Sequence, residues 1–287
     1  MKVVNFGDLE EEYTQYSKSQ IVILPVSFDK TSTWLKGSER GPRAIIDASR
    51  NLELYDIDTG TEVYRNGIYT AKEIRPESSE VLNREVHAAV RNYIQEGKFA
   101  VLLGGEHSVS YGAIKAHIEE YGNLSVLQMD AHTDMRDIYE GNIYSHACIM
   151  ARVRELTPNI TSVGVRSMDS SELKNLDIGR VFFAKDLHGN SRWFRRVIRQ
   201  LEQKVYLSID LDVFDPSLMP STGTPEPGGF SWYQTLDFLK EVAKRRCIVG
   251  FDVVELCPGS GRAPDFLAAK LVYALLSFIF SNKTFHT

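Results

Sequence analysis

The sequence predicts an α/β fold built on a mostly parallel sheet with helices on both faces. Short apolar runs, each of the length of a buried strand, alternate along the chain with longer segments in which apolar residues recur at helical spacing. Four of the apolar runs end in acidic or imidazole side chains, which is typical of a sheet whose strand ends form a ligand site. These polar residues extend from His107 to Glu255, and a domain boundary between them would divide the site. We therefore predict a single domain over residues 1–287.

The first part of the chain contains one clear strand and one short helix. Residues 21–26 form an apolar run that predicts a buried strand. A helix is predicted over residues 42–51, because Pro42 is favourable in the first turn of a helix. Residues 52–78 contain scattered Gly and Pro residues and predict only short strands and turns.

Two longer helices are predicted next. Between residues 78 and 96 the apolar side chains recur at helical spacing, with Ser79 as the predicted N-cap and Gly97 as the predicted end. Ser108 is the predicted N-cap of the following helix, which runs to about residue 120.

The remaining elements follow from the same periodicities. The predicted strands cover residues 99–103, 124–129, 160–165, 180–183, 204–209 and 246–254. The predicted helices cover residues 145–156, 191–203, 232–244 and 262–280. The apolar part of the last helix, residues 266–280, contains Lys270 and is too short for a membrane span, so we expect it to be buried. Residues 281–287 are expected to fray.

The composition is that of an ordinary soluble protein, with 43% apolar and 25% charged residues. The net charge of −5 and the pI near 5.9 give no reason to expect a nucleic-acid partner. The N-terminal segment is too acidic for a signal peptide, so we expect a cytoplasmic protein with no membrane partner. Cys148, Cys247 and Cys257 form no C-x-x-C pair and are expected to be reduced and structural.

The end of the predicted strand 124–129 is the most informative stretch for function. Its apolar run stops at Asp130, His132 and Asp134. In extended backbone alternate side chains point to the same side, so three ligand-type groups would leave the strand together. Burying carboxylates without a partner is costly, and a divalent metal ion would satisfy several of them at once.

Other strand ends add further groups of the same kind. The full set of candidate metal ligands is His107, Asp130, His132, Asp134, Asp210 and Asp212. Six ligands are too many for one ion and suit two, and a carboxylate-rich set without cysteine favours manganese. Two ions about 3.5–4 Å apart can hold a bridging hydroxide that attacks at neutral pH.

Each candidate ligand also has an ordinary explanation when it is taken alone. His107 after two glycines could be a turn residue or a core histidine, and Asp130, Asp210 and Asp212 could cap turns or helices. Their joint occurrence at the ends of successive strands favours the metal site.

Four motifs of the sequence resemble those of the ureohydrolase family, which includes arginase and agmatinase. The motifs are Gly104-Gly105-Glu106-His107-Ser108, Asp130-Ala131-His132-Thr133-Asp134, Ser208-Ile209-Asp210-Leu211-Asp212-Val213-Phe214-Asp215-Pro216 and Gly223-Thr224-Pro225-Glu226-Pro227-Gly228-Gly229. The resemblance covers nearly the whole chain, and it implies a three-layer α/β/α arginase-like fold, two Mn²⁺ ions per subunit and a homotrimer or homohexamer.

The resemblance also implies a role for each ligand. By this resemblance His107 binds one manganese ion and His132 the other, and Asp130 and Asp210 bridge the two. Asp134 completes the shell of the first ion, and Asp212 that of the second.

Two further residues match the catalytic positions of this family. His146, in Tyr144-Ser145-His146-Ala147, matches the family's loop histidine and is the candidate acid or proton shuttle; the alternative is an ordinary histidine at a helix start. The family more often has Gly than Ala at position 147. Glu255 matches the carboxylate that binds the guanidinium through parallel N–H bonds, and its alternative is a salt bridge at a strand end.

The loop after Asp134 indicates the substrate. Arg136 stands where arginases carry an Asn that reads the α-carboxylate of arginine, which favours the agmatinase branch. Agmatine has a distal ammonium and no carboxylate, so Asp137, Glu140 or Asp169 could bind that ammonium. We select Asp169, for which a surface turn cap is the alternative. The expected reaction is hydrolysis of agmatine to putrescine and urea by a metal-bridging hydroxide, a step of polyamine biosynthesis.

Three other functions remain open. The chain could be another amidinohydrolase, acting on arginine, guanidinobutyrate or aminopropylagmatine. It could hydrolyse other bonds, such as amides or phosphates, although no Lys/Arg cluster stands beside the ligands. It could also be a non-catalytic metal-binding scaffold, which the presence of both His146 and Glu255 disfavours.

Overall fold

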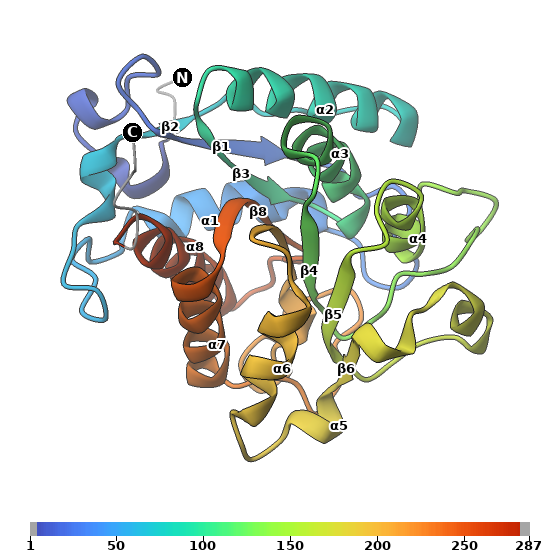
Figure 1. The fold of residues 1–287 in the computed structure, drawn as a ribbon. Coiled ribbons are helices and arrows are strands. Elements are labelled where there is room, and N and C mark those ends of the chain that lie inside the picture. Colours follow the sequence, from blue (N-terminus) through green and yellow to red (C-terminus); the bar gives the residue numbers. More distant parts are fainter. Residues whose placement is uncertain (1–4, 282–287) are drawn as a thin grey trace.

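One parallel sheet organises the molecule (Figure 1). The computed structural model describes residues 5–281, so the predicted fraying of residues 282–287 lies outside the described residues. The sheet has eight strands in the order β2-β1-β3-β8-β7-β4-β5-β6, and every pair is parallel. The strands are β1 (Ile21–Val26), β2 (Ile68–Thr70), β3 (Phe99–Gly104), β4 (Ser125–Met129), β5 (Ile160–Val165), β6 (Val181–Phe183), β7 (Lys204–Asp210) and β8 (Cys247–Val254).

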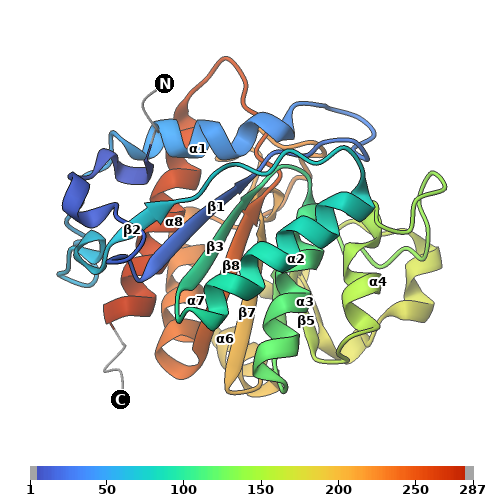
Figure 2. The same cartoon turned by 90° about the horizontal axis from the view of Figure 1, so that it is seen from above.

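Helices cover both faces of this sheet (Figures 1 and 2). On one face lie α1 (Gly41–Ser49), α6 (Arg192–Gln200), α7 (Trp232–Arg245) and α8 (Ala263–Ser281). On the other face lie α2 (Ser79–Gln95), α3 (Ser110–Tyr121) and α4 (Ile149–Arg154). The predicted α/β fold with helices on both faces is confirmed.

Strand periodicity sorts the apolar side chains into two cores. In β1, Ile21 and Ile23 join the core under α8, whereas Val22 and Leu24 join the core under α2. The helix α8 is long and apolar enough to cross a membrane, but 72% of its most apolar window is buried in the structure. The prediction of a buried last helix is therefore confirmed.

Several helix ends differ from the sequence prediction. Ser78, not Ser79, caps α2, because Ser78 has extended backbone and its side chain accepts a hydrogen bond from the Val81 N–H. Ser108 does not cap α3, because it lies in a 3₁₀ turn before the helix and donates its hydroxyl to Glu106.

Short helical turns account for the other differences. The predicted helix over 145–156 is a 3₁₀ turn (His146–Cys148) followed by α4, and the one-turn helix α5 (Ala184–Leu187) was not predicted. The helix predicted over 191–203 corresponds to α6, which ends at Gln200. The other 3₁₀ turns are Phe6–Asp8, Glu11–Tyr13, Ser38–Arg40, Val63–Asn66, His107–Val109, Ser170–Asn175, Ile178–Arg180 and Leu211–Val213.

The strand order decides where the site lies. The chain passes from β3 through α3 to β4, yet β8 and β7 lie between these two strands in the sheet. Such a change of winding direction opens a crevice at the carboxyl edge of a parallel sheet. The central strands β3, β8, β7 and β4 are the ones that end in the candidate site residues.

A buried histidine in α3 predicts how the stability of the fold depends on pH. The Nε2 of His117 has no hydrogen-bond partner among residues 5–281, and its Nδ1 lies 2.7 Å from the Ala113 carbonyl. Burial lowers the pKa of His117 from 6.5 to about 4. At a pH between these two pKa values, the histidine is protonated in the unfolded chain and neutral in the folded chain. We expect this group to remove about 2 kcal/mol of stability between pH 7 and pH 5.

Denaturant unfolding of His117→Leu tests this expectation. The variant should lose less stability than the wild type on acidification over that range, and the exposed His188→Leu should behave like the wild type. An acid dependence in His117→Leu equal to that of the wild type would contradict the assignment.

Candidate metal centre and active site

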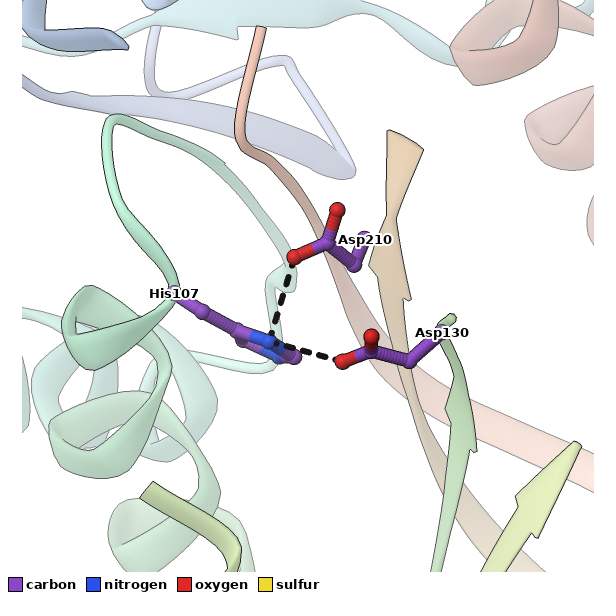
Figure 3. Close-up of side chains that lie close together, drawn as sticks. All are labelled: His107, Asp130 and Asp210. Carbon is purple, nitrogen blue, oxygen red and sulfur yellow. Dashed lines mark ion pairs between the residues drawn. The ribbon is translucent and has the colours of Figure 1, made fainter. Parts of the chain in front are cut away.

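The six candidate ligands meet at the carboxyl edge of the sheet, and His107 lies among three carboxylates. Figure 3 shows His107 with Asp130 and Asp210. Its Nδ1 atom is 2.9 Å from Asp134 Oδ2, 3.1 Å from Asp130 Oδ2 and 3.4 Å from Asp210 Oδ2. His107 follows β3, whereas these carboxylates come from the ends of β4 and β7. Residues distant in sequence therefore form one group.

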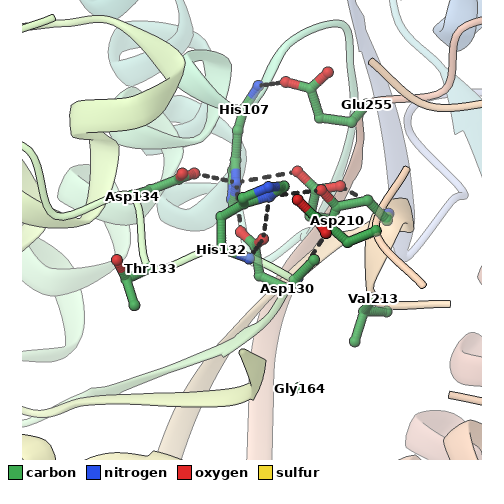
Figure 4. A network of polar contacts seen from close by, with 12 residues as sticks. His107, Asp130, His132, Thr133, Asp134, Gly164, Asp210, Val213 and Glu255 are labelled. Atoms are coloured by element: carbon green, nitrogen blue, oxygen red, sulfur yellow. Dashed lines mark hydrogen bonds and ion pairs between the residues drawn. The ribbon is translucent and has the colours of Figure 1, made fainter. Parts of the chain in front are cut away.

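A second group adjoins the first and shares one carboxylate with it (Figure 4). His132 Nδ1 lies 2.8 Å from Asp212 Oδ2 and 3.6 Å from Asp130 Oδ1. The two oxygens of Asp130 thus face different imidazoles, which is the geometry of a bridging ligand. Asp210 stands in the His107 group, and its predicted contact with the second ion stays a prediction.

Hydrogen bonds behind His107 fix the orientation of its ring. Its Nε2 lies 2.9 Å from the Ser208 hydroxyl, which donates to Asp252 Oδ1 at 2.8 Å. Tyr206 donates to the other oxygen of Asp252 at 2.9 Å. Because the Ser208 proton is given to Asp252, Ser208 accepts from Nε2–H, and the lone pair of Nδ1 faces the three carboxylates.

The buried Nδ1 of His107 has no hydrogen-bond partner within the part of the chain that the structure describes. A ligating histidine usually donates its other ring N–H to a hydroxyl, carbonyl or carboxylate chain of this kind. Sequence reasoning missed Ser208 and Tyr206, although they lie two and four residues before Asp210 on the same side of β7. That spacing was the available signal.

The electrostatics of the group also fit a divalent ion. Burial, together with Asp212, raises the pKa of Asp210 well above its usual range, and burial with Asp130 raises the pKa of Asp134 to about 7. Burial opposes the protonation of His132, but the charge of Asp212 outweighs it and raises the pKa of His132 to about 12. Crowded carboxylates thus hold protons at neutral pH, and bound cations would replace them. The residues fit two metal ions.

The backbone at the site departs from the prediction. The strand ends at Met129, and Asp134 has a left-handed φ of 51°, so the expected alternation of extended backbone does not bring these ligands together. Glu255 also has a left-handed φ, of 67°. Such backbone in residues with a Cβ costs about 1–3 kcal/mol and is concentrated at functional sites.

His146 and Glu255 line the same cavity as the ligands, a space of about 320 Å³. Glu255 Oε1 accepts a hydrogen bond of 2.7 Å from the His107 N–H, and burial raises the pKa of Glu255 well above its usual range. His146 Nδ1 lies 3.2 Å from the Thr31 hydroxyl, which donates to Glu106. Burial lowers the pKa of His146 to about 4, so its imidazole is neutral at pH 7.

The structure places Asp169 in a turn that borders the cavity. It caps the turn Ser170–Asn175 by accepting from the Ser171 N–H, and it also lines the cavity. Its Oδ2 lies 3.5 Å from Arg136. Contact with a substrate ammonium stays a prediction. Asp137, another candidate, is paired with Lys174 instead.

Arg166, which sequence reasoning did not single out, ties the loops around the cavity together. Its Nη2 donates to the carbonyls of Asp212 at 2.6 Å and Glu226 at 2.8 Å, and its Nη1 donates to that of Gly164 at 3.1 Å. The arginine directly follows β5 at the carboxyl edge of the sheet. That position after a strand was the signal that could have identified it.

Comparison with known proteins identifies the family. Residues 19–277 match the arginase family model, which is most of the chain. The chain belongs to the arginase family. Family membership confirms the predicted resemblance to ureohydrolases, and it agrees with the two groups of buried His and Asp residues that can hold metal ions.

Its relatives within the ureohydrolases are similar over nearly their full length. An N(1)-aminopropylagmatine ureohydrolase of Synechocystis sp. is 35% identical over 93% of this chain and 92% of the relative. An agmatinase of Pyrococcus horikoshii is 31% identical over 94% of this chain and 95% of the relative. The crystal structure of agmatine ureohydrolase of Thermoplasma volcanium matches with a TM-score of 0.90 and 30% identity, covering 100% of this chain and 98% of that one.

The ligand geometry predicts what removal of one carboxylate does. Asp210→Asn should lose bound metal, measured by elemental analysis after dialysis. Mn²⁺ at about 100 times its dissociation constant should raise the Tm of the wild type by about 5 °C, because a ligand of the folded state stabilises it. Asp210→Asn should lack this rise.

Asp215→Asn is the matched control. Asp215 belongs to the same sequence motif, but its side chain binds the backbone N–H groups of Ser217 and Gly228 and lies outside the metal groups. This control should retain metal. Full metal occupancy in Asp210→Asn would show that the ligand assignment is wrong.

Proposed function

We propose that this chain is a manganese-dependent ureohydrolase that hydrolyses agmatine to putrescine and urea. The supporting observation is that Glu255 and His146 line one cavity together with four of the candidate ligands, His132, Asp134, Asp210 and Asp212. A guanidinium carbon is a poor electrophile, because its positive charge is delocalised. Hydrolysis therefore needs a strong nucleophile, a fixed guanidinium and a proton for the departing amine, and the cavity holds residues for each.

Glu255 is the group that would hold the guanidinium. One of its oxygens accepts from the His107 N–H, and the other is left to accept from the substrate. Gly223 stands next to this second oxygen, since a Cβ on Gly223 would lie 3.7 Å from Glu255 Oε2. The glycine keeps the space beside the carboxylate open.

The metal ligands would be the six residues described above, and the carboxylate-rich donor set favours Mn²⁺. Two bound divalent ions supply Lewis acidity and lower the pKa of water, so that a nucleophile is available at neutral pH. His146 would move the proton. Its neutral ring is held through Nδ1 by Thr31, and its Nε2 has no hydrogen-bond partner among the described residues. Nε2 is thus the atom that would carry a proton to the departing amine.

The second candidate substrate is N¹-aminopropylagmatine, a longer guanidino amine. A relative with 35% identity is named for its hydrolysis. Beyond the metal ligands the cavity is lined by Asp169, Glu172, Glu226 and Glu255 against the single Arg136. This excess of negative charge favours cationic tails and disfavours the carboxylates of arginine and guanidinobutyrate.

Steady-state urea release with Mn²⁺ on all four guanidines tests the proposal. We expect kcat/KM to be at least roughly tenfold higher for the two amines than for the two carboxylates, because the difference in charge is worth one or more kcal/mol in the cavity. The higher of the two amine values identifies the preferred substrate. Faster turnover of arginine than of either amine would overturn the proposal.

The proposed role of His146 gives a separate prediction. His146→Ala should bind metal as the wild type does and lose roughly 10²- to 10⁴-fold in kcat, the usual contribution of a positioned general acid or base. The exposed His188→Ala should keep wild-type turnover. Unaltered turnover in His146→Ala would remove the role of proton carrier.

A further inference from the structure

The acids that line the cavity are not equally available to a ligand. Outside the metal groups these acids are Asp169, Glu172, Glu226 and Glu255. Glu255 holds the His107 N–H and faces the space beside Gly223. Glu172 is buried and accepts hydrogen bonds from the Thr133 hydroxyl and from the N–H groups of Met135, at 2.9 Å, and Asp169, at 2.8 Å. Glu172 is therefore fully used within the protein, and Glu255 keeps only the oxygen that we propose to hold the guanidinium.

Asp169 is occupied in a different way. Its Oδ1 accepts from the N–H and the hydroxyl of Ser171, at 3.0 and 2.6 Å. Its Oδ2 faces Arg136 Nη2 at 3.5 Å. The same guanidinium lies 3.8 Å from Glu172 and 4.9 Å from the centre of the Tyr139 ring, which holds it in place. A substrate ammonium approaching Asp169 would meet a fixed positive charge beside it.

Glu226 differs from the other three acids. Its carboxylate has neither a hydrogen bond nor an ion pair with any residue in the described part of the chain, and the residue is half-buried at the cavity. Its backbone is fixed, since Arg166 donates to the Glu226 carbonyl from Nη2 at 2.8 Å and from Nε at 3.2 Å. The charge of the Arg166 guanidinium also acts on this carboxylate, but both carboxylate oxygens keep the capacity to accept N–H bonds from a ligand cation.

The position of Glu226 relative to Glu255 suits a linear diamine tail. A Cβ on Gly223 would lie 3.7 Å from Glu255 Oε2, and Glu226 is three residues further along, so at most about 11 Å of chain separates Gly223 from Glu226. Both Glu255 and Glu226 line the cavity, so a substrate held at Glu255 by its guanidinium has Glu226 within the same space.

We propose that Glu226, rather than Asp169, binds the distal ammonium of the guanidino-amine substrate and is the residue that selects an amine over a neutral tail. This assignment rests on the proposed function. Asp169 then has a positioning role, because it holds Arg136 and caps its own turn.

The test compares agmatine with 1-pentylguanidine, in which a methyl group replaces the ammonium. The wild type should favour agmatine in kcat/KM. In Glu226→Gln this preference should fall roughly 10- to 100-fold, mainly through KM, as expected for the loss of one charge-assisted contact. Turnover of 1-pentylguanidine should stay near the wild-type value, which also shows that the variant is folded.

Asp169→Asn is the matched comparison and should lower the preference clearly less than Glu226→Gln does, because Arg136 keeps its second carboxylate, Glu172, and an exposed ion pair is weak. A preference for agmatine that is unchanged in Glu226→Gln would overturn the assignment. So would an equal loss of preference in Asp169→Asn.

Calorimetry of putrescine binding to the Mn²⁺-loaded protein separates this inference from the proposed function. If the wild type releases no urea from either guanidine, the proposed function is refuted. The affinity for putrescine still tests whether Glu226 binds an ammonium group, because it does not depend on turnover. That affinity should weaken roughly 10- to 100-fold in Glu226→Gln. Equal putrescine affinity in wild type and variant would overturn the proposal.

Discussion

The carboxylate of Asp130, shared between the buried imidazole of His107 and the half-buried imidazole of His132, is the contact around which this molecule is arranged. One of its oxygens faces His107 and the other faces His132. Gln128 donates to Asp130 at 2.8 Å, and Ser162 in turn donates to Gln128 at 2.7 Å, so the carboxylate is fixed from behind by two neighbouring strands. Bringing several such carboxylates out of water is costly unless a cation compensates for their charge. Bound divalent cations would supply this compensation for the whole donor set.

The order of the strands makes this crowding possible. Parallel strands place all their carboxyl ends at one edge, and the reversal of winding between β3 and β4 leaves that edge open above the centre of the sheet. The local backbone conformation then sets the directions of individual side chains at this edge. Asp134 and Glu255 adopt left-handed conformations, which direct their side chains where a regular strand would not. The packed core below supplies the stability that such local strain requires.

The acids around the candidate metal centre differ in how far their charge is already compensated. Glu255 and Glu172 accept hydrogen bonds from backbone N–H groups, whereas Asp169 is paired with Arg136. Glu226 keeps a carboxylate without a hydrogen bond or ion pair among the described residues. Under the proposed function, the excess of acids would disfavour carboxylate tails, and the acid that still lacks a partner would decide where a cationic tail binds. Membership of the arginase family concerns the hydrolysis at the guanidinium end of a substrate. The differences among these acids concern the distal end of the proposed substrate.

The sequence alone determined the parallel α/β fold, most strand positions and the residues that form the two metal groups. These features are local: an apolar run predicts a buried strand, and a polar residue at its end needs no knowledge of distant partners. Helix caps were less well determined, because Ser78 and Ser79 differ only in backbone conformation. Tertiary structure decided the rest. The pairing of His107 with Ser208, the clamp made by Arg166 and the neutralisation of Asp169 by Arg136 each join segments that are separate in the chain. Whether a polar side chain has a hydrogen-bond or ion-pair partner depends on residues that only folding brings next to it. The type of the residue does not say which residues these are.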